Sequence, residues 1–436
     1  MRSLLKISLC LRWLSLALLI LFSLATHAQR KKCGTTEYGK IISRNLPLET
    51  EQQFEDWVRQ QIKFKKSKIN ARTEFTNYKV QVVVHVIHNG EAIGTGTNIP
   101  ASQIISQLKV LNDDFNRLNA DSTNTPGEFK PFAGKMNIDF ELATVNPTGQ
   151  LDSGIVRVMG TKSTWMMSDN AELKSLSYWP AENYLNIWVC DLTDFAGYTQ
   201  FPTSTLPGLD DSPKSRLTDG VVIWYKAFGT SGAGNFDLDP ALNLGRTATH
   251  EVGHFFGLRH IWGDTTNCAG TDYVADTPPQ NQTSGCPLHP QKDCPAANPM
   301  DKMFQNYLDY TNDACMNIFT QGQVDRMKVV LENSPRRFSL LLPFEPATEI
   351  VSFQKIFSPN GDGVNDYWKW ANTLDYQGCR LTIFNRFGKK VFETVSYDNS
   401  WDGRSADGLQ LEAEAYYYTI HCDGKNEITG GVRIVR

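Results

Sequence analysis

The sequence lacks an excess of charge of either sign, and beyond its first two dozen residues it lacks any long apolar run. Its 43 basic and 47 acidic residues give a formal net charge of -4, which leaves no basic surface of the kind that binds nucleic acid. No later stretch approaches the roughly 20 apolar residues that a membrane-spanning helix needs. We therefore expect neither a nucleic-acid partner nor a transmembrane segment.

The N-terminus has the three-part layout of a secretory signal peptide. Basic residues precede an apolar run at 14–24, and small residues follow at 26–28. This arrangement predicts a signal peptide over 1–28, cleaved after Ala28, and an exported protein. The alternative is a membrane anchor, but a run of about a dozen residues is too short to span a bilayer. Cys10 precedes the apolar run, so no lipid-anchored cysteine is expected.

At 436 residues the chain exceeds the size of a single hydrophobic core, so we expect several units. A polar, basic stretch at 29–72 is interpreted as a propeptide, with a disordered arm as the alternative. Alternating valines from 80 onward begin a catalytic domain over 73–337. A linker is expected at 338–348, and short strands separated by Gly, Asp and Asn predict a small β-sandwich over 349–436. Within these units, strands are expected at 137–142, 184–190 and 220–225, and helices at 51–65, 102–118 and 321–332.

Histidine is scarce, with eight in the chain, yet three of the eight fall in the HExxHxxGxxH motif at 250–260. On a helix, His250 and His254 lie on one face and can bind one metal ion, with Glu251 beside them to polarise a water molecule. Gly257 lets the chain leave helical geometry so that His260 can return as a third ligand. Three ligands and an open fourth position are the pattern of a catalytic zinc site.

The alternative, a chance match, is reasonable for HExxH alone but not for five fixed positions together. The remaining histidines of the mature chain show no ligand spacing and are interpreted as strand or loop residues; they are His85, His88, His289 and His421.

Beyond this motif the chain resembles the pappalysin family of metzincins over residues 79–336. The resemblance rests on GLRHIWGD at 257–264, DYVADTP at 272–278, NYLDY at 306–310 and CMNIFT at 315–320. It implies an α+β metzincin fold with a mixed sheet, an active-site helix and a loop-rich lower subdomain. It also implies that Tyr310 stabilises the oxyanion, and that Leu308 occupies the place of the methionine beneath the zinc. Met316 matches a different part of the family pattern.

The resemblance further assigns residues around the cleft. Spacing alone allows three pairings of the four clustered cysteines, and the family pattern implies Cys268–Cys294 and Cys286–Cys315. It implies calcium ligands at Asp272, Asp276 and Thr277, for which a polar turn is the alternative. It also places Asp313 at the floor of the pocket that receives the side chain after the scissile bond, so Arg or Lys is expected there.

Cys33 lies in the basic stretch and resembles the family's cysteine switch, in which a propeptide thiolate occupies the open zinc position. The pairings implied above leave this cysteine free. The alternative is a disulfide between Cys33 and Cys190. If the enzyme cuts before Arg, the bond from Ala71 to Arg72 is the expected activation site.

The last 85 or so residues resemble the gliding-motility-associated C-terminal domain, a sorting module of the type IX secretion pathway. The matching segments are SPNGDGVND at 358–366, IFNRFG at 383–388, WDG at 401–403, YYY at 416–418 and GGVRIVR at 430–436. This implies export by that machinery to the medium or the cell surface. Residues 360–366 are interpreted as a turn, with a calcium loop as the alternative, and Cys379 and Cys422 are a candidate disulfide.

Together these features predict a secreted zinc-dependent endopeptidase, made as a latent zymogen, that acts on proteins or peptides and binds zinc and calcium. One alternative is a surface adhesin or binding module on a catalytically impaired metzincin fold, which only Leu308 favours. Another is a metal-dependent amidase acting on non-peptide substrates, which the acidic pocket residue and the propeptide disfavour.

Overall fold

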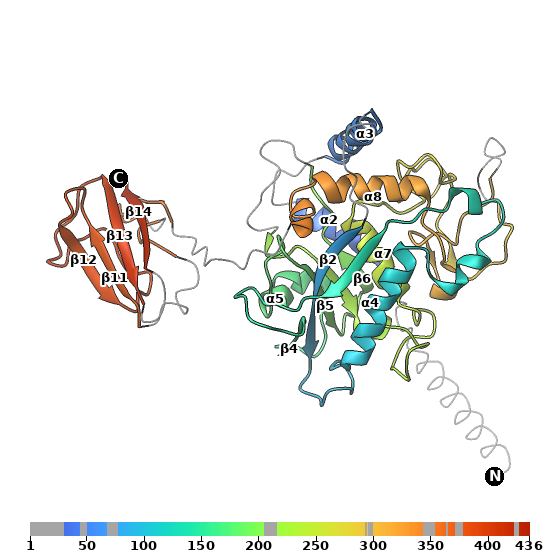
Figure 1. Ribbon diagram of the computed structural model, residues 1–436, viewed down its shortest axis with the longest axis horizontal. Coiled ribbons are helices and arrows are strands. Elements are labelled where there is room, and N and C mark those ends of the chain that lie inside the picture. Colours follow the sequence, from blue (N-terminus) through green and yellow to red (C-terminus); the bar gives the residue numbers. More distant parts are fainter. Residues whose placement is uncertain are drawn as a thin grey trace, which may run out of the picture. The chain divides into compact units, whose positions relative to one another are not determined.

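The computed structural model describes residues 30–43, 50–67, 77–204, 216–292, 294, 300–342, 354–362, 365–370, 378–422 and 427–436. The chain divides into two compact units, 1–346 and 347–436 (Figure 1). The expected signal peptide and the expected cleavage site at Ala71–Arg72 lie outside the described residues. Among the residues that are described, no helix has both the length and the apolar character needed to cross a membrane.

A seven-stranded mixed sheet forms the centre of the first unit, in the order β1-β6-β7-β5-β2-β3, with β4 also paired to β2. Neighbouring strands run parallel except β6 and β7. The strands are β1 (Lys31–Cys33), β2 (Tyr78–His88), β3 (Ile138–Leu142), β4 (Ile155–Met159), β5 (Leu185–Cys190), β6 (Phe195–Thr199) and β7 (Val221–Trp224). The three strands β5, β6 and β7 are buried along their whole length, as expected of a sheet covered on both faces.

Helices pack around this sheet (Figure 1). They are α2 (Thr35–Ser43), α3 (Glu51–Ser67), α4 (Ala101–Phe115), α5 (Asn170–Ser175), α7 (Arg246–Phe255) and α8 (Gln321–Asn333). Single turns of 3-10 helix occur at Ala120–Asn124, Lys130–Phe132, Met167–Asp169, Tyr225–Ala227, Asp313–Cys315 and Phe338–Leu341. The expected cap of α8 is present, because Thr320 Oγ1 accepts a hydrogen bond from the backbone N–H of Gln323 at 3.2 Å.

Two stretches differ from the expected organisation. The expected linker begins at 338, but Phe338–Leu341 is helical and Leu340 is buried in the main hydrophobic core. The apolar side chains at this point therefore continue the first unit. The expected propeptide is also more ordered than its polar composition suggests, because β1, α2 and α3 all contact the rest of the unit.

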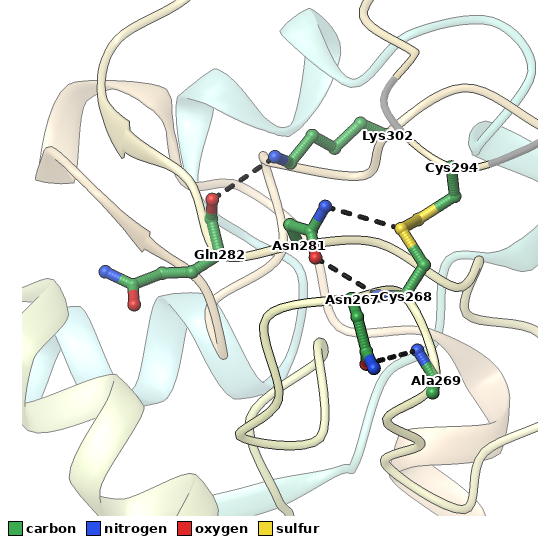
Figure 2. The surroundings of a disulfide bond; sticks show 7 residues. All are labelled: Asn267, Cys268, Ala269, Asn281, Gln282, Cys294 and Lys302. Carbon is green, nitrogen blue, oxygen red and sulfur yellow. Dashed lines mark hydrogen bonds between the residues drawn. A yellow bond between two sulfur atoms is a disulfide. The ribbon is translucent and has the colours of Figure 1, made fainter.

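The region between α7 and α8 is rich in loops and is joined by two disulfides, Cys268–Cys294 and Cys286–Cys315. Its described part contains the strand pair β8 (Ser284–Gly285) and β9 (Tyr310–Thr311) and the 3-10 turn Asp313–Cys315. Figure 2 shows how Asn281 fixes the first disulfide: its Oδ1 accepts from Cys268 N at 3.2 Å, and its Nδ2 donates to Cys268 Sγ at 3.3 Å. Covalent links and side-chain hydrogen bonds thus stabilise a region that has little secondary structure.

The second unit is a small β domain with a five-stranded sheet in the order β10-β14-β13-β11-β12. Its strands are β10 (Ile356–Phe357), β11 (Arg380–Phe384), β12 (Lys390–Val395), β13 (Ala415–His421) and β14 (Ile428–Ile434). The described part of this unit contains this one sheet, so the second layer of a sandwich is not seen there. Cys379 and Cys422 are bonded. Asp366 Oδ1 accepts from the N–H groups of Asn360 and Gly361, as in a turn between strands.

Candidate active site

The motif at 250–260 folds as the spacing predicts. Helix α7 is buried along its whole length and presents His250 and His254 one turn apart. The helix ends at Phe255, and Gly257 follows with a φ of +86°. Residues with a Cβ rarely adopt this left-handed conformation. The glycine therefore lets the chain reverse and bring His260 beside the first two histidines.

Each of the three imidazoles donates its Nδ1–H to a neighbouring oxygen. The acceptors are Tyr307 O for His250 at 2.7 Å, Leu258 O for His254 at 2.7 Å, and Asp264 Oδ1 for His260 at 2.6 Å. This fixes the tautomer, so that the unprotonated Nε2 of every ring faces inward. The Nε2 of His254 lies 3.1 Å from the Nε2 of each of the other two.

These nitrogens and the Sγ of Cys33 all lie within 4.8 Å of one another, and all four residues are buried. Burial lowers the pKa of His254 to about 3, so this ring is neutral and its lone pair is free to bind a cation. Three imidazole nitrogens and a sulfur are the ligand types that zinc takes in tetrahedral sites. The residues present therefore fit a zinc ion.

Glu251 lies beside the metal ligands and is fully buried. Its Oε2 accepts a hydrogen bond from the hydroxyl of Thr35 at 2.8 Å. Burial raises the pKa of Glu251 to about 8. Gly197 of β6 packs against this side chain, since a Cβ at position 197 would lie 2.9 Å from Glu251 Cγ. Strand β6 and the Glu251 side chain are thus in contact.

Leu308 lies in a turn next to His250, and Tyr310 follows as the first residue of β9. The Tyr310 hydroxyl donates to the backbone oxygen of Cys33 at 3.3 Å, and its ring lies 4.9 Å from that of His260. Leu308 is fully buried, and a Cβ on Gly253 would lie 3.2 Å from its Cδ2. Leucine therefore fills the space beneath α7, as expected for a side chain similar in volume to methionine.

Asp313, the expected floor of the pocket that receives the side chain after the scissile bond, begins the 3-10 turn Asp313–Cys315 and is fully buried. Its Oδ2 accepts from the N–H groups of Leu244 and Arg246 at 3.1 and 3.0 Å. Its Oδ1 lies 3.8 Å from the Nζ of Lys32. Lys32 also donates to Thr311 O and contacts Met316 Sδ at 3.5 Å. Met316 thus lies beside the Lys32 side chain.

The proposed calcium residues are brought together only in part. Thr277 Oγ1 lies 2.8 and 2.9 Å from the two carboxylate oxygens of buried Asp272. Asp276 instead accepts from the N–H of Gly322 at 2.8 Å, at the start of α8. Cys33 and Cys190 are both free, so the alternative disulfide between them is not formed.

Sequence reasoning missed two residues of the site, Lys32 and Thr35. The signal for Lys32 was its position directly before Cys33, together with the expected preference for basic side chains. Thr35 had no comparable signal. Among the histidines interpreted as non-ligands, His289 lies near two carboxylates, those of Glu128 and Asp301. This group is separate from the one formed by Cys33 and the three metal-facing imidazoles.

Comparison with known proteins agrees with this geometry. Residues 169–332 match the peptidase family described as pregnancy-associated plasma protein-A, and residues 351–434 match the type IX secretion signal domain. An extracellular metalloprotease of Arthroderma otae is 31% identical over 251 residues, which are 57% of this chain and 76% of the relative. Extracellular metalloprotease 1 of Coccidioides posadasii is 29% identical, over 72% of this chain and 94% of its own length.

Two solved structures are also similar. Mature mirolysin of Tannerella forsythia, in complex with a cleaved peptide, is 44% identical, covers 61% of this chain and 96% of its own, and has a TM-score of 0.54. A promirolysin variant from the same organism is 40% identical, covers 71% of this chain and 97% of its own, and has a TM-score of 0.57. This chain therefore belongs to the pappalysin family of metalloproteases, is secreted, and carries a type IX secretion signal domain.

Proposed function

We propose that this metalloprotease is a zinc-dependent endopeptidase, made as a latent zymogen, that cuts peptide bonds before Arg or Lys. One observation carries the proposal. In two consecutive residues of its N-terminal segment, Lys32 points its ammonium group at Asp313 while Cys33 places its thiol against the three metal-facing nitrogens. The segment would thus fill the proposed specificity pocket and the open metal position together.

In the proposed mechanism, His250, His254 and His260 would hold the zinc. A bound zinc ion lowers the pKa of water and polarises the scissile carbonyl. Glu251 takes the proton of the attacking water and later donates it to the leaving amine. Tyr310 donates a hydrogen bond to the oxyanion. Its hydroxyl already donates to a peptide carbonyl oxygen, that of Cys33, within the cleft.

The proposed preference for Arg or Lys rests on Asp313. This carboxylate is buried and faces a lysine, and the backbone N–H groups of Leu244 and Arg246 fix its orientation. A buried carboxylate favours a cationic side chain over a neutral one of the same length. Digestion of a mixed peptide library with the mature enzyme should give cuts before Arg and Lys, and cut sites without that preference would contradict this part of the proposal.

Latency would depend on three contacts made by adjacent residues. Cys33 would bind the zinc, Lys32 fills the pocket, and Thr35 hydrogen-bonds to Glu251. In addition, β1 pairs with β6, which would be the edge strand without it, so the segment also occupies backbone hydrogen-bonding groups of β6. Activation would require cleavage in the stretch between α3 and β2, where Ala71–Arg72 remains the proposed site; N-terminal sequencing of the mature protein tests it.

Replacing Cys33 by alanine should speed maturation and abolish the delay before activity appears. Loss of one of the four proposed zinc ligands should weaken the binding of the N-terminal segment by more than about 1.4 kcal/mol. This free energy corresponds to a tenfold change in the binding constant. Maturation is followed by gel electrophoresis after zinc is added to the purified zymogen. The control is Cys190→Ala, which removes the other free, buried cysteine. Equal maturation times for the wild type and Cys33→Ala would contradict the switch.

We also propose a calcium ion near Asp272, Asp276 and Thr277. Asp272 is a buried carboxylate whose described partners are neutral, Thr277 and the N–H of Val274, so an oxygen-seeking cation would stabilise it. Calcium should raise the melting temperature of the Glu251→Ala protein, and Asp272→Asn should remove that increase. Differential scanning calorimetry with and without calcium makes the measurement, with Asp237→Asn as an exposed control. An unchanged melting temperature would exclude the site.

The C-terminal domain implies that the chain engages the type IX secretion machinery. We propose that the exported enzyme is released to the medium or held at the cell surface. Fractionation of cells that express the full chain, followed by immunoblotting of medium and membrane, would distinguish these two fates.

A further inference from the structure

Helix α3 binds the catalytic domain at a surface that the metal site does not include. It packs against α8 and is drawn directly above that helix in Figure 1. We call this surface the α3 dock and define it by Phe201, Arg259, Arg326, Val329 and Val330. The three apolar members cluster with Phe54, Trp57 and Val58 of α3. The two arginines surround a single glutamate of the helix.

That glutamate is Glu55, whose side chain is 1% exposed. Its Oε1 accepts from Arg326 Nη2 and from Arg259 Nε, both at 2.6 Å, and its Oε2 accepts from Arg326 Nη1. Arg259 also pairs with Glu51 at 3.4 Å. Both carboxylates that pair with the arginines of the dock therefore belong to α3. Charge-assisted hydrogen bonds that are shielded from water are among the strongest that proteins form.

Aromatic contacts surround this ion pair. Phe54 meets Phe201 edge to face, with ring centroids 5.1 Å apart. The guanidinium of Arg259 lies over Phe201 at 4.9 Å. The dock thus recognises a helix that carries a glutamate with an aromatic residue directly before it and another two positions after it.

The dock is connected to the metal site through the backbone. Arg326 Nε donates to the backbone oxygen of Gly257 at 2.7 Å, and Arg259 directly precedes His260. Arg259 is therefore part of the turn that positions His260, and Arg326 is hydrogen-bonded to that turn. A helix in the dock lies against the segment that leads into the cleft.

Loss of the N-terminal segment would remove the carboxylates that pair directly with the two guanidiniums in the described structure, leaving Asp272 as a longer-range partner of Arg326, and would expose the apolar members of the dock. An unpaired buried cation beside apolar surface favours an anionic, amphipathic partner. We propose that in the mature enzyme the α3 dock is an exosite, which recruits protein substrates carrying a helix of the Phe-Glu-x-Trp type. This rests on the proposed function, because the dock opens only if the segment is removed.

Direct binding tests the dock independently of catalysis. The probe is a fluorescent peptide of residues 50–67, titrated with mature full-chain enzyme that a zinc chelator keeps inactive, with fluorescence anisotropy as the readout. The Glu55→Gln peptide is the matched control, and because the change is in the peptide, enzyme folding is not affected. The control should bind at least about tenfold more weakly. Equal binding of the two peptides, or no binding of either, would overturn the proposal.

A kinetic test then asks whether the dock recruits substrates. A short fluorogenic reporter is fused to the 50–67 helix, or to its Glu55→Gln form. In both fusions, glutamine replaces the basic residues of the helix, so that the enzyme cuts the reporter bond and not the helix. The replaced residues are Arg59, Lys63, Lys65 and Lys66. The helix should raise kcat/KM for the reporter about tenfold over the Glu55→Gln fusion, through KM and not kcat.

The outcomes separate the two proposals. If the unfused reporter is not cut, the proposed proteolysis fails, while the anisotropy result still decides whether the dock binds. If the peptide binds but both fusions give the same kcat/KM, the dock retains only the released segment, and its role as a substrate exosite is refuted.

Discussion

Replacing Glu251 by alanine is expected to lower kcat for peptide hydrolysis by about 10²–10⁴-fold, the usual contribution of a general acid–base residue. The carboxylate is fully buried beside the three metal-facing imidazoles. Its Oε2 already accepts a hydroxyl hydrogen bond, from Thr35. In the proposed mechanism the attacking water takes the place of that hydroxyl, so the variant loses the group that accepts its proton.

The measurement uses mature protein and a fluorogenic peptide with Arg after the scissile bond. Since the variant cannot activate itself, trace wild-type enzyme removes its N-terminal segment and is then separated. Zinc content, measured by mass spectrometry, should stay at that of the wild type because no ligand is changed. Glu141→Ala, which removes an exposed strand carboxylate, is the control. More than a tenth of wild-type activity in the Glu251 variant would exclude this role.

Changing Asp313 to asparagine is expected to lower kcat/KM for substrates with Arg or Lys after the scissile bond by roughly 30-fold to several thousand-fold. This range corresponds to the 2–5 kcal/mol lost when one partner of a buried charge pair is neutralised. The amide can still accept the hydrogen bonds from Leu244 and Arg246 through its oxygen. Asparagine is therefore a milder change than alanine, and the fold should persist.

Matched peptides that differ only in the residue after the scissile bond provide the comparison. Hydrolysis of the peptide with Leu at that position should change little in Asp313→Asn, since no ion pair is lost there. Asp237→Asn removes an exposed carboxylate and serves as the control. If the Arg and Leu peptides lose activity equally, Asp313 supports the structure of the site and does not select the substrate.

Much of the catalytic centre could be predicted because the residues that form it lie close together in the sequence. Residues His250 and His254 share a helix face, and Gly257 explains the return to His260 within six residues of His254. The fold class and the family were confirmed, and the identified relatives are metalloproteases, so the binding-module alternative has no support beyond Leu308. Leu308 itself simply fills the space below α7.

The contacts of the N-terminal segment could not be read from the sequence. Thr35 meets Glu251 across 216 positions, and Glu55 meets Arg326 across 271. Threonine and glutamate are both common in polar stretches, so the local sequence around Thr35 and Glu55 did not indicate their partners. Similarly, a buried Leu340 cannot be distinguished from a linker leucine until the core that receives it is known.

The pairing of β1 with β6 also affects how the exported protein associates with other molecules before it binds a substrate. Without β1, the outer side of β6 would be an open edge, whose unpaired N–H and C=O groups can join the strands of other molecules. In the structure β1 covers this edge with the chain's own backbone, which protects the protein from edge-to-edge association. Removal of β1, as proposed for activation, would make the same edge a template for extended peptides. Competitive inhibitors of the mature enzyme should therefore be strand-like and should have free backbone amides.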